Sequence, residues 1–245
     1  MRRKLLLIPL LSLLFSFTNL SKPTIYLIGD STMANKSADK FPETGWGEAF
    51  YAYADSSKIN IENHARNGRS TKSFINEGLW KVVINKIKPG DYLFIEFGHN
   101  DEKIHKPKVY ARAETTYKLN LERFINEARA KGATPILFTP IVRRDFQENG
   151  LLNDTHGNYP KVVKQVGEEM NVPVIDMEAK TKLLVERYGI EGSKFLYLQP
   201  KPGEYPNYPK GKIDNTHLSR EGAIIIAGEA VKCIKKQIPE IAPYF

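Results

Sequence analysis

Residues 25–32 read Ile-Tyr-Leu-Ile-Gly-Asp-Ser-Thr. This apolar run, with two isoleucines and an aromatic residue, is typical of a buried strand, and Gly29 ends it. Ser31 follows two residues later. Because open α/β sheets place their chemistry at the carboxyl ends of the strands, the hydroxyl of Ser31 is the first candidate functional group of the chain.

Further apolar stretches predict more strands, and helical patterns lie between them. We expect strands near residues 24–28, 59–63, 92–97, 135–139 and 173–176, and helices near residues 71–87, 111–131, 161–170, 178–188 and 219–236. Strands that alternate with helices form a parallel sheet that is covered on both faces. Since no linker interrupts this pattern, residues 22–245 are expected to fold as one domain.

The first residues have the pattern of an export signal. Residues 2–4 are basic, and they precede an uncharged apolar run over residues 5–17 that is too short to span a membrane. We therefore expect residues 1–21 to be a signal peptide that is cleaved between residues 18 and 21. The mature protein would be periplasmic or extracellular, without a membrane span. The alternative is an uncleaved anchor.

The chain carries an excess of positive charge. Without the three basic residues of the leader, the formal charge falls from +8 to +5. Such an excess suits a polyanionic partner, although solubility alone explains it equally well. Nucleic acid is a poor candidate, because the protein is expected to be exported and has no zinc-finger, helix-turn-helix or aromatic RNA-binding motif. An acidic polysaccharide fits an exported protein better.

The sequence contains none of the common cofactor motifs. Cys233 is the only cysteine, so an intrachain disulfide is excluded, and its apolar surroundings predict a thiol packed in the core. The first strand is not followed by Gly-x-Gly-x-x-Gly, and a phosphate-binding loop is missing. The carboxylates are not spaced as metal ligands. We expect neither a cofactor nor a catalytic metal.

A serine, a histidine and an aspartate could form a nucleophilic site. The hydroxyl of Ser31 is a weak nucleophile until a base takes its proton, and His217 can be that base because imidazole titrates near neutral pH. Asp214 lies three residues before His217, so its carboxylate can bind the other ring nitrogen and fix the tautomer. Taken alone, Gly-Asp-Ser is typical of a turn, and Asp-x-x-His of a loop or a helix start.

Acyl transfer also needs hydrogen-bond donors for the negative oxygen of the tetrahedral intermediate. Gly68 can offer a backbone N–H with no side chain in the way, Asn100 a side-chain amide, and Ser31 its own N–H. An aspartate in place of Asn100 would repel the oxyanion. The alternatives are a plain turn at Gly68 and a helix cap at Asn100. The order of the motifs favours a site, because each begins where an expected strand ends or lies in a late loop.

This order resembles that of the SGNH (GDSL) hydrolase superfamily over the whole mature chain. The resemblance rests on Gly29-Asp30-Ser31, on Gly68 within Asn-x-Ala-x-x-Gly-Arg-Ser, on Gly98-His99-Asn100-Asp101 and on Asp214-x-x-His217. The second of these motifs and the late Asp-Asn-Thr-His-Leu-Ser most resemble the bacterial rhamnogalacturonan acetylesterases. The loop that carries Arg143-Arg144 and Asp154-Thr155-His156-Gly157 is similar to theirs as well.

The resemblance implies a three-layer α/β/α sandwich with a five-stranded parallel sheet in flavodoxin-like order. It also implies a serine esterase that removes O-acetyl groups from the backbone sugars of pectin. By this resemblance Ser31 is the nucleophile, and Asp214 and His217 complete the triad. Ser31, Gly68 and Asn100 then form the oxyanion hole.

Basic and aromatic residues near these motifs are candidate substrate contacts: Trp46, Arg143, Arg144, Lys201, Tyr205, Tyr208 and Lys210. Trp46 could stack on a sugar, with a core position as the alternative. The segment 201–212 directly precedes Asp214, so it could form a rim of the site or a plain solvated loop. Its tyrosines offer stacking surfaces, and the basic residues could meet uronate carboxylates.

We therefore expect an exported serine carbohydrate O-acetylesterase that acts on an acetylated acidic polysaccharide or oligosaccharide. An acetylxylan esterase or another small-acyl esterase is one alternative. A lipase or thioesterase of the same superfamily is another, but it would need an apolar acyl groove, and the loops here are polar, aromatic and basic. The third is a carbohydrate-binding protein without catalysis, which the complete set of five site residues argues against.

Overall fold

The computed structural model describes residues 22–245, and the expected signal peptide over residues 1–21 lies outside them. The strands are β1 (Thr24–Gly29), β2 (Asn60–Asn63), β3 (Tyr92–Glu96), β4 (Thr134–Phe138) and β5 (Val174–Ile175). Each lies within about one residue of its predicted position, so the expected strands are confirmed.

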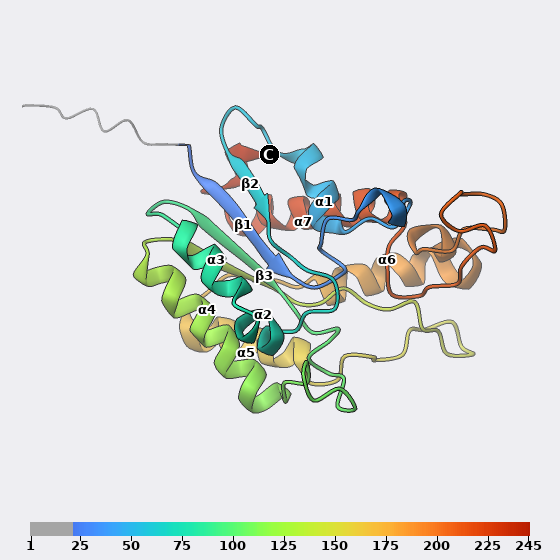
Figure 1. The fold of residues 1–245 in the computed structure, drawn as a ribbon, viewed down its shortest axis with the longest axis horizontal. Helices are drawn as coiled ribbons and strands as arrows, with labels where there is room; N and C mark the ends of the chain where they lie inside the picture. The colour runs from blue at the N-terminus through green and yellow to red at the C-terminus, as the bar shows by residue number, and fades with distance from the viewer. Residues whose placement is uncertain (1–21) are drawn as a thin grey trace, which may run out of the picture.

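The strands form a single parallel sheet in the order β2-β1-β3-β4-β5 (Figure 1). This confirms the α/β class and the flavodoxin-like order. In the sheet, Leu27 of β1 lies between Asn63 of β2 and Phe94 of β3. The strand order reverses beside β1, and sheets of this kind bind their ligands outside the carboxyl ends of the strands at such a point.

Helices cover both faces of the sheet. They are α1 (Trp46–Ala49), α2 (Thr71–Asn76), α3 (Leu79–Lys86), α4 (Lys118–Ala130), α5 (Tyr159–Met170), α6 (Met177–Gly192) and α7 (Arg220–Gln237). One face packs against α2 to α5, and the other against α1, α6 and α7 (Figure 1). The three expected layers are therefore present.

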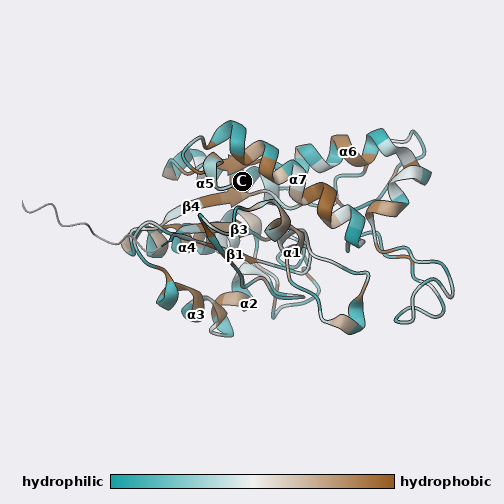
Figure 2. Cartoon of the chain, turned by 90° about the horizontal axis from the view of Figure 1, so that it is seen from above, coloured by the Kyte–Doolittle hydropathy of each residue, from teal (hydrophilic) through white to brown (hydrophobic). Residues whose placement is uncertain are grey.

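Side chains of the central strand alternate between the two helical layers. Tyr26 and Ile28 pack in the hydrophobic cluster with α2 to α5, whereas Ile25 and Leu27 pack in the cluster with α1, α6 and α7. All four are buried, which explains why the strand reads as an unbroken apolar run. Figure 2 shows hydrophobic stretches in β1 and β4, and helices in which hydrophobic and hydrophilic residues alternate.

Two of the expected helices are interrupted. The prediction of a single helix over 71–87 is wrong. This segment forms two helices, α2 and α3, because Gly78 between them adopts a left-handed conformation with φ of 75°. The helix predicted over 111–131 begins as a π-helical turn, Ala113–Tyr117, which α4 then continues. In both cases the apolar spacing runs on across the interruption and so gives no sign of it.

The last helix supports the C-terminal part of the candidate site. Ser219 caps α7, as its Oγ accepts a hydrogen bond of 3.0 Å from the N–H of Gly222. Gly222 packs so closely on the preceding segment that a Cβ would lie 1.9 Å from the carbonyl oxygen of Leu196. Cys233 is buried in α7, as expected. Within residues 22–245, no helix combines the length and the apolar character needed to cross a membrane.

Candidate active site

Ser31 lies in a tight turn directly after β1. Oδ1 of Asp30 accepts hydrogen bonds of 3.0 Å from both the backbone N–H and the hydroxyl of Thr32, and these bonds fix the turn. Gly29 has no room for a side chain, because a Cβ there would lie 2.6 Å from the carbonyl oxygen of Glu96 on β3. The serine therefore stands at the carboxyl end of the sheet, beside the loop that follows β3.

Hydrogen bonds join Ser31, His217 and Asp214. Oγ of Ser31 lies 3.0 Å from Nε2 of His217, and Nδ1 of His217 lies 2.8 Å from Oδ2 of Asp214. The backbone of Leu198 anchors the late segment: its N–H donates to the carbonyl oxygen of His217 (2.9 Å), and its carbonyl oxygen accepts from the N–H of Asp214 (3.1 Å). This geometry lets the imidazole take the proton of the serine hydroxyl.

The carboxylate of Asp214 is held in its ionised form. Burial opposes ionisation, but hydrogen bonds from the ring and backbone of His217 and from the N–H of Thr216 hold the pKa of Asp214 well below its usual range. Lys212 adds an ion pair at 3.1 Å. An ionised carboxylate keeps a proton on Nδ1 of His217, so Nε2 can accept the proton of Ser31.

Arg144 is buried and holds the same segment in place. Its backbone N–H donates to the carbonyl oxygen of Asn215 (2.8 Å), and its Nη1 donates to Oδ1 of Asn215 (3.2 Å). Its Nε donates to Oγ of Ser193 (3.0 Å). The predicted substrate contact at Arg144 is therefore wrong, since the residue is only 8% exposed and its donors are used within the protein.

Gly68 and Asn100 come from the loops that follow β2 and β3. Gly68 has φ of 75°, and a Cβ there would meet no atom within 4 Å, so the conformation and not a lack of space requires glycine. Nδ2 of Asn100 donates to the carbonyl oxygen of Arg69 (2.9 Å), and its Oδ1 accepts from Nζ of Lys103 (2.7 Å). These contacts fix the amide and leave the second hydrogen of Nδ2 for a substrate oxygen.

Two buried carboxyl groups lie next to Ser31. The hydroxyl of Thr32 lies 3.0 Å from Oδ1 of Asp30 and 3.3 Å from Oε1 of Glu96. Burial, and then the charge of Asp30, raise the pKa of Glu96 to about 8. Burial also raises the pKa of Asp30, against the hydrogen bonds from Thr32. Two carboxylates so close do not ionise together readily, so burial and the charge of Asp30 both favour the protonated form of Glu96.

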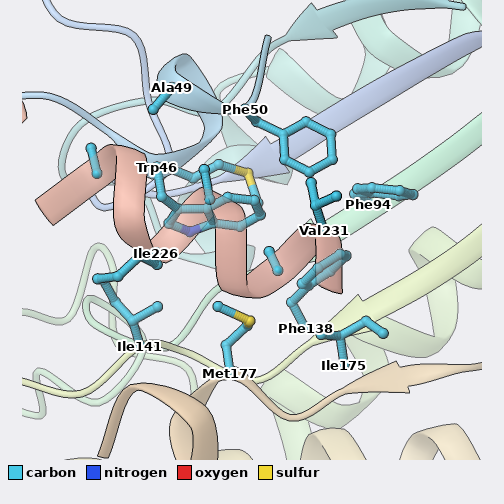
Figure 3. Close-up of a cluster of buried hydrophobic side chains, with 14 of the residues drawn as sticks. Trp46, Ala49, Phe50, Phe94, Phe138, Ile141, Ile175, Met177, Ile226 and Val231 are labelled. Carbon is cyan, nitrogen blue, oxygen red and sulfur yellow. The ribbon is translucent and has the colours of Figure 1, made fainter. Parts of the chain in front are cut away.

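Trp46 is a core residue. Its ring is fully buried, and Figure 3 shows it within the cluster that contains Phe50, Phe138 and Ile226. The rings of Trp46 and Phe138 lie 5.5 Å apart between their centroids. The prediction that Trp46 stacks on a sugar is therefore wrong, and the alternative of a core position is confirmed.

Arg143 lies beside the loop that carries Asn100, but its charge is paired within the protein. Nη2 lies 2.5 Å from Oε1 of Glu102 and donates to the carbonyl oxygen of His99 (3.3 Å). Oε2 of Glu102 also binds Nδ1 of the buried His156 (2.8 Å). The side chain of Arg143 is 18% exposed, so its main contacts fix the loop.

The segment 201–212 packs on the segment that follows the nucleophile. The hydroxyl of Tyr208 donates to the carbonyl oxygen of Lys40 (3.1 Å), and the ring of Tyr205 meets that of Phe41 with 5.6 Å between centroids. These contacts explain why a stretch rich in proline and glycine keeps a defined position. The predicted substrate contacts at Tyr205 and Tyr208 stay predictions.

A basic cavity of about 550 Å³ lies directly before Asp214, and we call it the lysine cavity. The basic side chains along it are Lys201, Lys210 and Lys212, of which the first two were predicted substrate contacts. A larger cavity of about 660 Å³ lies between segment 201–212 and the end of α6. It contains none of the five predicted site residues, and glutamates line part of it.

A second basic cavity, of about 460 Å³, lies beside Gly68, and we call it the arginine cavity. Arg66 and Arg69 line it, together with Asn35 and Asn67. Arg69 forms an ion pair at 2.8 Å with Glu77. Within residues 22–245, the ion pairs include none with Arg66, so its charge is available to a ligand.

Arg66 and Lys36 lie at the candidate site and were not predicted from the sequence. Arg66 falls inside the motif that ends in Gly68-Arg69-Ser70, so its position two residues before the predicted oxyanion glycine was an available signal. Lys36 contacts the carbonyl oxygen of Ser31, and no sequence pattern indicates this. Among the residues that the structure describes, His, Cys, Asp and Glu side chains form no group of three or more that could hold a metal ion.

A parallel α/β/α sandwich that joins a serine, a histidine and an aspartate at the carboxyl end of its sheet has the form of a serine-type acyl hydrolase. Residues 27–223 match the sequence profile of the GDSL-like Lipase/Acylhydrolase family. The chain belongs to this family, and it is an ester hydrolase.

Relatives match the chain over most of its length. It is 42% identical over 217 residues to the rhamnogalacturonan acetylesterase RhgT of Bacillus subtilis, covering 89% of this chain and 90% of that protein. It is 35% identical to YesY, a probable rhamnogalacturonan acetylesterase of the same organism, covering 89% of this chain and 93% of that one.

Solved structures share the fold. The YxiM protein of Bacillus subtilis superposes with a TM-score of 0.75 at 30% identity, covering 89% of this chain and 57% of that chain. Axe2, an acetylxylan esterase from Geobacillus stearothermophilus, superposes with a TM-score of 0.62, covering 86% of this chain and 94% of that one. At 20% identity, the second likeness shows the fold alone.

Proposed function

We propose that the protein is an exported serine carbohydrate O-acetylesterase that removes acetyl groups from rhamnogalacturonan. The observation that carries the proposal is the pair of hydrogen bonds from Ser31 to His217 (3.0 Å) and from His217 to Asp214 (2.8 Å). The names of the two Bacillus subtilis relatives support the choice of substrate, because both match this chain over nearly their full length.

The proposed reaction passes through an acetyl-enzyme. Nε2 of His217 takes the proton of Ser31 while Oγ attacks the acetyl carbonyl carbon. The oxygen of the tetrahedral intermediate accepts hydrogen bonds from the backbone N–H groups of Ser31 and Gly68 and from Nδ2 of Asn100. The bond to the sugar oxygen then breaks, and His217 returns its proton to that oxygen. Water attacks the acetyl group by the same route and releases acetate.

The charges around the proposed triad suit an acidic polymer. The lysine cavity adjoins Asp214, and the arginine cavity adjoins Gly68. An extended polyanion that reaches from Ser31 into either cavity would therefore meet positive charge. Amide and cationic side chains along these cavities also suit a sugar acid better than a fatty acyl chain, which supports an acetylesterase over a lipase.

The test is acetate release from acetylated rhamnogalacturonan, acetylated xylan and p-nitrophenyl acetate, with wild type measured beside Ser31→Ala. We expect release from the pectic polymer and its loss in the variant. Release from xylan alone would keep the serine mechanism and contradict the substrate. Activity that survives Ser31→Ala would contradict the mechanism. A series of p-nitrophenyl esters adds a check, since an acetylesterase prefers acetate steeply over long acyl chains.

Export rests on the leader pattern in residues 1–21. Its test is N-terminal sequencing of the protein recovered from the periplasm or the medium. A first residue between 19 and 22 would match the predicted cleavage zone. An intact leader on membrane-bound protein would favour the anchor instead.

A further inference from the structure

The side chain of Lys36 connects the loop of Ser31 with the loop of Gly68. Its Nζ lies 2.5 Å from the carbonyl oxygen of Ser31 and 2.8 Å from Oδ1 of Asn67, the residue directly before Gly68. A third contact, at 2.9 Å, pairs it with Oε1 of Glu43. Three acceptors match the three N–H donors of an ammonium group, so the hydrogen-bonding capacity of Lys36 is fully used.

This ammonium group is buried, unlike that of an ordinary surface lysine. The side chains of Lys36 and Glu43 are 2% and 9% exposed. Burying a cation is costly unless it is paired and hydrogen-bonded, and here both conditions are met. Four residues later, Lys40 shows the usual arrangement: its side chain is 51% exposed, and it pairs with its neighbour Asp39. Lys36 therefore works as a cross-link inside the protein.

The position of the cross-link matters for the oxyanion hole. The two loops are also joined at their base, where the N–H of Arg66 donates to the carbonyl oxygen of Gly29 (3.0 Å). Lys36 joins them further out, at the carbonyl of the nucleophile and at Asn67. The backbone carbonyl of Asn67 belongs to the same peptide unit as the N–H of Gly68. Its oxygen accepts from Nη1 of Arg69 (2.9 Å), so Arg69 holds this peptide unit while Lys36 holds the side chain of Asn67.

We propose that Lys36 is a positioning residue that sets the spacing between the N–H groups of Ser31 and Gly68. The proposal rests on the proposed roles of those two residues in ester hydrolysis. Hydrogen bonds to an oxyanion form in the transition state, so loss of Lys36 lowers kcat and leaves KM nearly unchanged. A displacement of about 1 Å costs about 10²-fold in rate, and we therefore expect a fall in kcat of about 10- to 100-fold.

The test variant is the double substitution Lys36→Met/Glu43→Gln, because Lys36→Met alone would leave the buried carboxylate of Glu43 without its cation. The substrate is p-nitrophenyl acetate, whose hydrolysis does not depend on the polysaccharide. We expect the fall in kcat, a KM within about twofold of wild type and an unchanged pH profile of kcat/KM, since His217 is untouched. Lys40→Met, the same substitution at an exposed lysine, keeps the wild-type kcat. Lys36→Arg restores part of the loss.

Asn67→Ala removes the same contact from the other side without altering a buried charge. If Lys36 acts through Asn67, the two losses do not multiply when the variants are combined. Wild-type kcat in the Lys36→Met/Glu43→Gln variant, or losses that multiply fully, would overturn the proposal. Ser31→Ala separates this outcome from a failure of the proposed function: hydrolysis that survives there overturns the serine mechanism, whatever Lys36 does.

Discussion

The indole Nε1 of Trp46 donates a hydrogen bond of 2.8 Å to Oε2 of Glu96, and both side chains are fully buried. The backbone N–H of Ile141 reaches the other carboxyl oxygen at 3.3 Å. The carboxyl group at the end of β3 is thus held between the hydrophobic core and the turn that presents Ser31. Its protonation links the stability of the fold to pH.

We expect the free energy of unfolding to decrease as pH rises through the range in which Glu96 titrates. The folded protein has a Glu96 pKa of about 8, against an ordinary value of 4.5. The folded state holds this proton more tightly than the unfolded state, so stability is lost between these values as pH increases. Glu96→Gln should remove most of this loss. Denaturant unfolding of the wild type and of Glu96→Gln, from about pH 5 to about pH 9, measures the free energy of unfolding of each protein. If this free energy changed with pH equally in both proteins, the prediction would be contradicted.

Asp214→Asn should lower kcat by roughly 10³- to 10⁴-fold, because an amide favours the wrong tautomer of His217. Steady-state kinetics on p-nitrophenyl acetate measures the change. Lys212→Met is the matched control: it removes the half-exposed partner of Asp214 and should cost less than about fivefold. Comparable losses in the two variants would argue against the proposed role of the aspartate.

Asn100→Ala should lower kcat by about 10²- to 10³-fold with little change in KM, since it removes one oxyanion donor. Asn100→Asp should be worse, because a carboxylate repels the oxyanion while nearly keeping the size of the side chain. The comparison needs kcat and KM for both variants, with thermal unfolding as a check on folding. If Asn100→Asp were the more active of the two, Asn100 would not be a donor.

Arg66→Gln should raise KM for acetylated rhamnogalacturonan by roughly tenfold, because the guanidinium in the arginine cavity loses a uronate partner. It should leave KM unchanged for the same polymer after reduction of its carboxyl groups, and for p-nitrophenyl acetate. Arg123→Gln serves as the control, since Arg123 is an exposed arginine of α4 that pairs with Glu127. Equal effects on the acidic and the reduced polymer would rule out recognition of a carboxylate.

Local sequence was enough to locate the strands. Both faces of the sheet are covered, so β1, β3, β4 and β5 are short runs rich in apolar residues, and such a run can be recognised without knowledge of the rest of the fold. The edge strand β2, Asn-Ile-Glu-Asn, has a weaker apolar pattern. Local sequence does not specify the order of the strands in the sheet, and this order was predicted only from the resemblance to a known family. The division of the helix at Gly78 was not predictable, because glycine is tolerated inside helices and the apolar pattern continues beyond it.

The candidate site was predictable where residue type and position together specify chemistry, as at Ser31 and His217. Burial was harder to foresee. Trp46 lies between two glycines, and this sequence is compatible both with a ring that stacks on a sugar and with a ring buried in the core. Only the packing of α1 against the sheet shows that the ring is buried. Arg144 and Lys36 have long charged side chains, which from sequence alone are expected to be exposed. In the fold, both side chains are buried and donate hydrogen bonds to acceptors within the protein.

Ser31 and His217 are 186 residues apart, and α7, which packs behind the histidine segment, follows the histidine and ends at Gln237. A ribosome that has already made Ser31, Gly68 and Asn100 has not yet made the base. The growing polypeptide therefore carries the nucleophile and the oxyanion donors long before it carries the base. The set of reacting groups is complete only after α7 has been made and has docked against the sheet.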